Sequence, residues 1–411
     1  MIKILHFADA HIDMARQGQL DTKTGLSIRV MDFLKSLDTI VETAIAEKVD
    51  LVVFSGDAYR DRTPAPTYQR EWGRRMMRLS RAGIPTLLLI GNHDVSPAQT
   101  RAHAMQEYDT LSPEFLHVVS KPCLLGPEEL DGVQVQVVAI PWITRSGLAA
   151  SLNGGEGEAR DLALEIENAI DNLIREFVQK LDPDLPTILA AHASVAGAKL
   201  GQERYIMIGR DVMLQPGLLR NPAFDYVALG HIHLFQDLNE GAQPPIVYPG
   251  SIERVDFGES NDIKGFVLAE IEKGNTRYQF RRLNTRPYIE CYTQVSGEER
   301  LMDKLLEALP EAGEMKDAIV RLTIDFPREL EPLIDERRLQ EKAVEAFQFV
   351  LYRRPSDRPR GRIGDSHETE NLTPLELLDL YWKESHFTGI DRDQLKSLAD
   401  GIINASRGDE G

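Results

Sequence analysis

Carboxylate, amide and imidazole side chains recur in this sequence directly after short apolar stretches. They lie in the segments Asp9-Ala10-His11, Gly56-Asp57, Gly91-Asn92-His93-Asp94, His192 and Gly230-His231-Ile232-His233. Oxygen donors and neutral imidazoles together suit Mn, Fe or Zn ions, and the lack of cysteine among them argues against a closed structural zinc site. A carboxylate such as Asp57 can bridge two ions, and two ions about 3.5–4 Å apart can hold a hydroxide for in-line attack on phosphorus. These residue types predict phosphoester hydrolysis at a dinuclear metal centre.

The five segments can form one site only if a fold brings them together. The apolar residues of the region 1–283 follow the pattern of such a fold. We expect strands over 2–7, 51–54, 86–90, 133–140, 187–191 and 226–229, and helices over 28–47, 66–82 and 158–180. This alternation is typical of an α/β sheet covered on both faces. The carboxyl ends of such strands line a ligand crevice. Glycines directly before the candidate ligands allow the sharp turns and close approach that the crevice requires.

A smaller α+β unit is expected over 284–352. Its strands are predicted at 288–295, 318–326 and 347–352, and its helices at 298–308 and 335–345. Residues 353–371 have no apolar period and are predicted to form a flexible basic linker, whose arginines either contact DNA or are simply solvated. Two short helices are expected within 372–407; their apolar stripe suits either docking to a partner or packing into a core.

Bulk composition narrows the function classes. The chain has 411 residues, a formal net charge of −18, and only two cysteines, Cys123 and Cys291, with no ligand-pair spacing. A reducing cytoplasm fits best, and no apolar run is long enough for a membrane span. The acidic charge argues against a nucleic-acid partner. However, the formal net charge counts carboxylates as negative even where bound cations neutralise them.

The ordered set DxH, GD, GNHD, a lone His and GHxH resembles the calcineurin-like metallophosphoesterase superfamily. Three stretches, FSGDAY (54–59), YVALGHIH (226–233) and YPGSIER (248–254), resemble the SbcD-like DNA-repair exonucleases, the bacterial branch of the meiotic-recombination-eleven nucleases. The resemblance implies the metallophosphoesterase fold, with β-sheet layers flanked by helices, a capping domain at 284–352 and C-terminal helices. It also implies a Mn-dependent DNA nuclease with 3′–5′ double-strand exonuclease and single-strand or hairpin endonuclease activity.

The resemblance assigns roles to the site residues. One metal ion would be held by Asp9, His11, Asp57 and His233, and the second by Asp57, Asn92, His192 and His231. His93 would face the scissile phosphate as an acid or charge stabiliser, and Asp94 would orient a histidine. Arg60, where archaeal relatives have histidine, and Arg254 are weaker candidates for phosphate binding; an exposed surface residue is the alternative for Arg254. The remaining histidines are expected to be core or surface residues.

The implied partners are DNA and an SbcC-like ABC-type coiled-coil ATPase, which would bind the C-terminal helices. The implied assembly is a homodimer within a heterotetramer of the SbcCD type. Two alternatives stay open. A small-molecule phosphoesterase or cyclic-nucleotide phosphodiesterase uses the same ligand types, and a largely non-catalytic protein could tether DNA ends.

Overall fold

The computed structural model describes residues 1–14, 20–96, 102–143, 159–199, 201, 213–356, 373, 375, 378 and 395–400. The chain divides into two compact units. The first comprises Met1–Ile289 with Asp317–Ile319, and the second comprises Glu290–Lys316 with Val320–Gly411. The change of unit thus falls six residues after the boundary expected at 283, and a short piece of the later sequence returns to the first unit.

Two six-stranded sheets form the first unit. One sheet has the order β14 (Asn275–Arg282), β13 (Gly265–Glu272), β1 (Ile2–Phe7), β2 (Leu51–Phe54), β3 (Thr86–Leu89) and β4 (Leu116–Val119). The other has the order β11 (Gln236–Asp237), β12 (Ile246–Tyr248), β10 (Tyr226–Gly230), β7 (Thr187–His192), β6 (Gln136–Ile140) and β5 (Cys123–Leu125). In the first sheet β1, β2, β3 and β4 are parallel, and β13 and β14 form an antiparallel edge. The second sheet has a parallel centre and an antiparallel strand at each edge.

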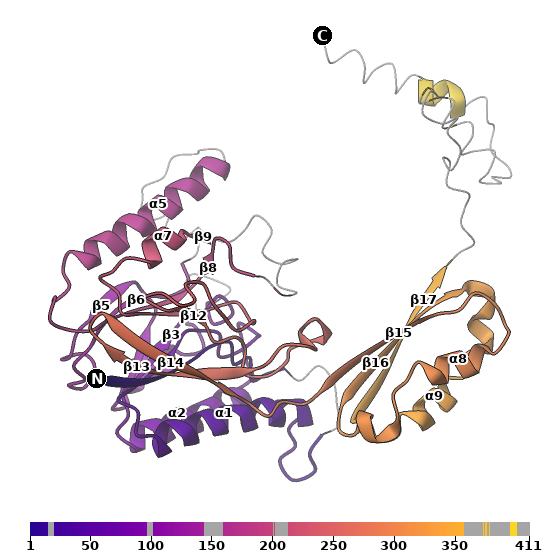
Figure 1. Cartoon of the computed structure of the whole chain (residues 1–411), viewed down its shortest axis with the longest axis horizontal. Helices are drawn as coiled ribbons and strands as arrows, with labels where there is room; N and C mark the ends of the chain where they lie inside the picture. The colour runs from indigo at the N-terminus through magenta and orange to yellow at the C-terminus, as the bar shows by residue number, and fades with distance from the viewer. Residues whose placement is uncertain are drawn as a thin grey trace. The chain divides into compact units, whose positions relative to one another are not determined.

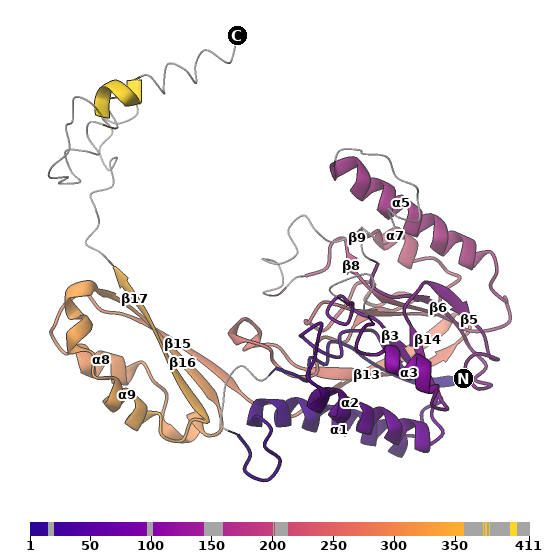
Figure 2. The same ribbon diagram turned by 180° about the vertical axis from the view of Figure 1, so that it is seen from behind.

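The sheets pack face to face, and helices cover their outer faces (Figures 1 and 2). Alternate strand residues such as Ile4, Val53 and Ala190 belong to the buried cluster between the sheets. Their neighbours Leu5 and Phe54 face the opposite way, into the cluster beneath the first two helices. The fold is therefore the expected metallophosphoesterase arrangement of β-sheet layers flanked by helices. Each sheet is covered on both faces, by helices on its outer face and by the other sheet on its inner face.

Helix α1 (Ile28–Ala46) begins where the Ser27 hydroxyl accepts a hydrogen bond from the Arg29 amide, and α2 (Pro66–Arg81) begins with a proline whose missing N–H costs nothing there. Both lie on the outer face of the sheet that contains β1 (Figure 1). Helices α5 (Ala159–Val178) and α7 (Pro216–Leu219) cover the other sheet. The shorter elements are α3 (Gln106–Leu111), β8 (Ser194–Val195), β9 (Met213–Leu214) and the 3₁₀ turn η1 (Phe257–Glu259).

The second unit contains a three-stranded sheet with the order β15 (Tyr288–Gln294), β16 (Ile319–Pro327) and β17 (Gln348–Ser356). Its helices are α8 (Leu301–Glu307) and α9 (Glu336–Lys342), with 3₁₀ turns η2 (Ala312–Met315) and η3 (Arg328–Leu333). Alternate residues of β16, including Leu322 and Ile324, are buried. The α+β composition expected for this part of the chain is what the structure contains.

Strand β17 continues to Ser356, so the first residues of the expected linker, which starts at 353, belong to a strand instead. Residues 357–371 lie outside the described residues, as does most of the segment 372–407. Within that segment 395–400 are helical. No helix among the described residues is long and apolar enough to cross a membrane.

Candidate metal centre

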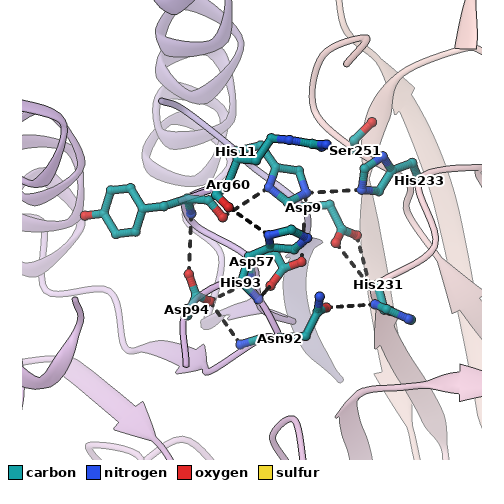
Figure 3. A network of polar contacts seen from close by, with 12 residues as sticks. Asp9, His11, Asp57, Arg60, Asn92, His93, Asp94, His231, His233 and Ser251 are labelled. Carbon is teal, nitrogen blue, oxygen red and sulfur yellow. Dashed lines mark hydrogen bonds and ion pairs between the residues drawn. The ribbon is translucent and has the colours of Figure 1, made fainter. Parts of the chain in front are cut away.

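Both sheets deliver side chains to one place. Strands β1, β2 and β3 are parallel neighbours in one sheet, and β7 and β10 are parallel neighbours in the other. His192 is the last residue of β7, and the loops after the other four strands carry the remaining candidate ligands. Those labelled in Figure 3 point toward one another from both sides of the interface between the sheets. The convergence expected from the sequence therefore arises from two sheets.

One group of three residues offers ligand atoms that all lie within 4.8 Å of one another: Asp9, His11 and His233. The Nε2 atoms of His11 and His233 are 3.1 Å apart. Both carboxylate oxygens of Asp9 accept from the backbone amide of His231, at 3.2 and 3.1 Å, which fixes this carboxylate between the two sheets. All of these side chains are buried.

The second such group is Asp57, His192 and His231. The Asn92 Oδ1 atom lies 2.9 Å from both His192 Nε2 and His231 Nδ1, so the amide joins this group. Asp57 Oδ2 lies 3.5 Å from His192 Nε2 and 3.9 Å from His11 Nε2 in the first group. Asp57 therefore lies between the two groups, where a bridging carboxylate belongs.

The spacing of these donor atoms fits metal ions. Bonds of about 2.1 Å from one ion to nitrogen or oxygen place neighbouring donors roughly 3.0–3.5 Å apart. The His11–His233 pair at 3.1 Å and the His192–Asp57 pair at 3.5 Å match that spacing. Two unprotonated imidazole nitrogens cannot hydrogen-bond to each other, so a cation suits the first pair. The second group likewise directs an amide oxygen and a carboxylate oxygen at the same imidazole nitrogen.

The electrostatics also fit cations. Burial, followed by the nearby Asp94 and Asp9 carboxylates, holds the pKa of Asp57 well above its usual value. Burial, followed by the neighbouring imidazoles of His233 and His93, holds the pKa of His11 well below 6.5. A divalent cation would favour the ionised Asp57 carboxylate and so oppose the rise in its pKa, and it would bind the neutral imidazole that burial already favours at His11. The centre is thus suited to bind a divalent cation.

Hydrogen bonds to the far side of each ring select the tautomer that binds metal. The Nδ1–H of His11 donates to the Tyr59 carbonyl at 3.1 Å, and the Nδ1–H of His192 donates to the Ser55 carbonyl at 2.6 Å. The Nε2 lone pairs of both rings therefore face the centre. Such outer contacts orient a ligand histidine and raise its basicity.

The backbone approaches the ligands so closely that glycine is required. Gly56 has a φ of +99°, and a Cβ atom there would collide with the His192 ring. A Cβ atom at Gly91 would collide with Asp57. The role predicted for these glycines, a sharp turn with close backbone approach, is confirmed.

Asp94 does not orient a histidine, and this expectation is wrong. Its carboxylate accepts backbone N–H groups from Gly91 at 3.0 Å, Asp57 at 2.8 Å and Ala58 at 2.9 Å. Asp94 therefore ties the loop after β3 to the loop after β2, and it holds the bridging Asp57 by its backbone.

His93 lies at the edge of the centre, with its ring perpendicular to that of His11 at a centroid distance of 5.2 Å. Its Nδ1–H donates to the Arg60 carbonyl at 2.8 Å, so Nε2 is the nitrogen left for a substrate. Its backbone N–H donates to Asp57 Oδ1 at 2.8 Å. Burial lowers the pKa of His93 to about 4, against the smaller opposing effect of the Arg60 carbonyl.

Arg60 is half-buried next to His93, and its positive charge lowers the pKa values of His93 and Asp57. Asp13, which the sequence analysis passed over, accepts the backbone N–H groups of Arg60 and Asp61 at 2.6 and 2.9 Å and so fixes this loop. A depression of about 780 Å³ starts at His93 and is lined by both Arg60 and Arg62. The structure thus places Arg60 beside the centre.

Arg254 is not placed for a phosphate contact. It is only 8% exposed, which also rules out the alternative of an exposed surface residue. Its guanidinium donates to the carbonyls of Glu259, Ser260 and Asp262 and to the Thr285 hydroxyl, the last at 2.6 Å. Because these contacts occupy both terminal nitrogens and Nε, Arg254 is a structural residue and the phosphate-binding prediction is not carried further.

Two further residues that contact the ligands were missed. Glu259 accepts the Nδ1–H of His233 at 2.7 Å, and the Trp142 ring packs on the His231 ring at a centroid distance of 5.0 Å. Glu259 follows no predicted strand, so no spacing signal marks it. Trp142 follows the strand predicted over 133–140, but an indole ring is not a metal-ligand type, so a search for ligand residue types does not mark it. Outside the centre, His6 is a buried core residue and His117 pairs with Asp131 at the surface, as expected for histidines that are not ligands.

The fold and the site together define a phosphoesterase with a candidate centre for two divalent metal ions. The profile of the family described as "Calcineurin-like phosphoesterase" matches residues 2–235, which is more than half of the chain. The chain therefore belongs to the calcineurin-like phosphoesterase family.

Two curated relatives are each 24% identical to the chain. One is the "Uncharacterized metallophosphoesterase YhaO" of Bacillus subtilis (strain 168), where the match covers 98% of this chain and 90% of the relative. The other is the "DNA double-strand break repair protein Mre11" of Archaeoglobus fulgidus, where it covers 97% and 83%. The chain is thus similar to both proteins over nearly its whole length.

Solved structures with a similar chain path include TT1561 of Thermus thermophilus, at 14% identity with a TM-score of 0.38. A dimetal phosphatase from Danio rerio has 11% identity and a TM-score of 0.41. Each comparison covers 68% of this chain, with 98% of the first structure and 96% of the second.

Proposed function

We propose that this protein is a Mn-dependent DNA nuclease subunit, with 3′–5′ double-strand exonuclease and single-strand or hairpin endonuclease activity, in an SbcCD-type double-strand-break repair complex. The observation that carries the substrate assignment is the length of the similarity to the archaeal Mre11 protein. It covers 97% of this chain, whereas the family match ends at residue 235. The parts that lie beyond a phosphoesterase domain are therefore shared with a protein whose name assigns it to DNA repair.

In this proposal Asp9, His11 and His233 hold one ion, Asn92, His192 and His231 hold the other, and Asp57 bridges them. When bound, the two ions supply a nucleophile at neutral pH and stabilise negative charge on the transferring phosphoryl oxygens. Manganese is the ion that the resemblance implies, and the mixed oxygen and nitrogen donors suit it.

His93 acts on the leaving oxygen. Because its Nδ1–H is committed to the Arg60 carbonyl at 2.8 Å, a proton gained at Nε2 is the one that it can transfer. The pKa of about 4 leaves this nitrogen unprotonated at neutral pH and makes the protonated ring a strong acid. The negative charge of a bound phosphodiester favours the protonated ring, so His93 would take this proton from solvent when substrate binds and pass it to the leaving oxygen.

Two arginines near the centre support a polyanionic substrate despite the net charge of −18. Arg60 and Arg62 line the same depression as His93, together with Asp13 and Asp61, and Asp13 already accepts the backbone N–H groups of Arg60 and Asp61. Arginine pairs with phosphate through planar, charge-assisted hydrogen bonds, so these two residues suit the phosphates next to the scissile one. The unit at 284–352 is proposed to cap the site, and segment 372–407 is proposed to bind the coiled-coil ATPase.

The test is cleavage of labelled duplex, hairpin and single-stranded DNA with Mn²⁺, with a cyclic nucleotide as the small substrate. Asp57→Asn and His93→Ala are each expected to lower DNA cleavage at least 100-fold, because one removes the bridging charge and the other the proton donor. His117→Ala is the matched control, since this histidine pairs with Asp131 away from the centre.

The outcomes separate the alternatives. Cleavage of the cyclic nucleotide but of no DNA substrate would replace the nuclease with a small-molecule phosphoesterase. DNA binding without Mn²⁺-dependent cleavage would favour a non-catalytic tether. Wild-type rates for Asp57→Asn would show that the chemistry lies elsewhere.

A further inference from the structure

A fully buried lysine lies behind one of the metal-binding histidines. The Lys264 side chain has 0% exposure, and its ammonium contacts three acceptors. It donates to Glu259 Oε2 at 2.9 Å, to the backbone carbonyl of His233 at 3.0 Å and to Asp262 Oδ2 at 3.3 Å. Burying an ammonium group is costly unless its hydrogen bonds are satisfied, so this arrangement needs a compensating role.

Glu259 links this lysine to the metal centre. Its Oε1 accepts the Nδ1–H of His233 at 2.7 Å, and its Oε2 accepts from Lys264 and from the backbone N–H of Val255, the latter at 2.9 Å. Lys264 thus supports His233 in two ways. Its ammonium donates to the backbone carbonyl of His233, and it pairs with the Glu259 carboxylate that accepts the N–H of the His233 ring.

Two of the other ligand histidines have neutral partners instead. His11 and His192 donate their Nδ1–H to neutral carbonyls, those of Tyr59 and Ser55. A carboxylate partner makes an imidazole a stronger ligand than a carbonyl does, because its negative charge stabilises the polarised ring. The group with His233 also contains the Asp9 carboxylate, which belongs to that group alone. The second group has only the Asp57 carboxylate, which lies between the two groups, and its other donors are neutral.

We propose that Glu259 and Lys264 are positioning residues that hold His233 for metal, and that the Asp9–His11–His233 site therefore binds its ion more tightly than the second site. The ion pair acts on the metal centre whichever phosphodiester is cleaved. A failure of the DNA assignment therefore leaves this proposal standing, and a failure here leaves the DNA assignment standing.

The primary test is Mn²⁺ binding to the full chain by calorimetry, with the melting temperature measured in parallel. The wild type is expected to bind two equivalents, one more tightly than the other. Glu259→Ala is expected to weaken the tighter one about 10- to 100-fold, with a smaller loss for Glu259→Gln, which keeps an acceptor. Glu253→Gln is the matched control, because this buried carboxylate contacts Arg254 and Arg286 amides and no ligand side chain.

The double variant Glu259→Gln, Lys264→Met separates positioning from stability. It removes both charges of the buried Glu259–Lys264 pair together. The remaining lysine partner, Asp262, has a side chain that is 18% exposed, so water can solvate it and the melting temperature is expected to stay near that of the wild type. The tighter Mn²⁺ equivalent is expected to stay weakened. Wild-type affinity at both sites in Glu259→Ala, or affinity loss that follows the melting temperature across all variants, would overturn the proposal.

Discussion

His6 offers a stability test that depends on the structure alone. The ring is fully buried at the interface between the sheets, where Nδ1 lies 3.0 Å from the Tyr226 hydroxyl and Nε2 lies 3.1 Å from Ser55 Oγ. Burial lowers the pKa of His6 from 6.5 to about 3, against a smaller opposing backbone hydrogen bond from Leu229. The perturbation is acidification, compared between the wild type and His6→Gln.

The sign and size of the effect follow from this pKa. A histidine whose pKa is depressed in the folded state contributes stability above pH 6.5, and that stability is lost as the pH falls toward 3. Each pH unit in that window costs about 1.4 kcal/mol per proton. Between pH 6.5 and pH 5 the His6 share is therefore about 1.5–2 kcal/mol of the free energy of unfolding.

The assay is guanidinium unfolding at pH 6.5 and pH 5, in a chelating buffer so that metal binding does not contribute. Other buried histidines titrate in the same window, so the informative quantity is the extra free energy that the wild type loses compared with His6→Gln. An extra loss of about 1.5–2 kcal/mol is expected. Equal losses in the two proteins would refute the assignment of a buried neutral imidazole.

Two further predictions concern the centre and its rim. Gly56→Ala is expected to destabilise the protein by about 1–3 kcal/mol and to reduce bound Mn²⁺, because the new methyl group meets His192 at a residue with a φ of +99°. Thermal unfolding and metal content measure the two effects. Unchanged values of both would contradict the prediction. Arg62→Glu is expected to raise KM for DNA about 10-fold and to reduce the salt dependence of binding. Arg74→Glu is the control, because this arginine is already paired with Glu71 at 2.9 Å. Equal effects of the two substitutions would exclude a specific role for the depression beside His93.

The part of the fold that sequence could predict is the part governed by local pattern. The runs at Ile2–Phe7 and Leu51–Phe54 are strands with the predicted bounds, because they are apolar, short and followed by polar turns. The centres of α1 and α2 follow from apolar spacing, and their N-termini follow from Ser27 and Pro66. The antiparallel strands β13 and β14 were not predicted. Strand β14 is largely exposed and lacks an apolar run, whereas β13 has a buried apolar run that the sequence prediction missed.

The pairing of strands is not a local property. Residues 2–7 and 226–229 read alike as buried strands, and nothing within either run says that they belong to different sheets. The ligand positions could be predicted because each directly follows a strand, whichever sheet holds it. Glu259 lies in a loop and meets His233 only through tertiary packing, so no spacing in the sequence marks the pair.

Several candidate ligands occupy a backbone conformation that their side chains disfavour. Asp9, His11, Asp57 and His231 have φ values of +51°, +40°, +64° and +102°. Such residues cost about 1–3 kcal/mol each and persist only where surrounding contacts over-determine them. The contacts here run between ligand loops, since the amides of Asp9 and His11 donate to the carbonyls of Gly56 and Asp57. Each loop holds the next in its strained form, so a change in one loop is expected to alter both groups of candidate ligands.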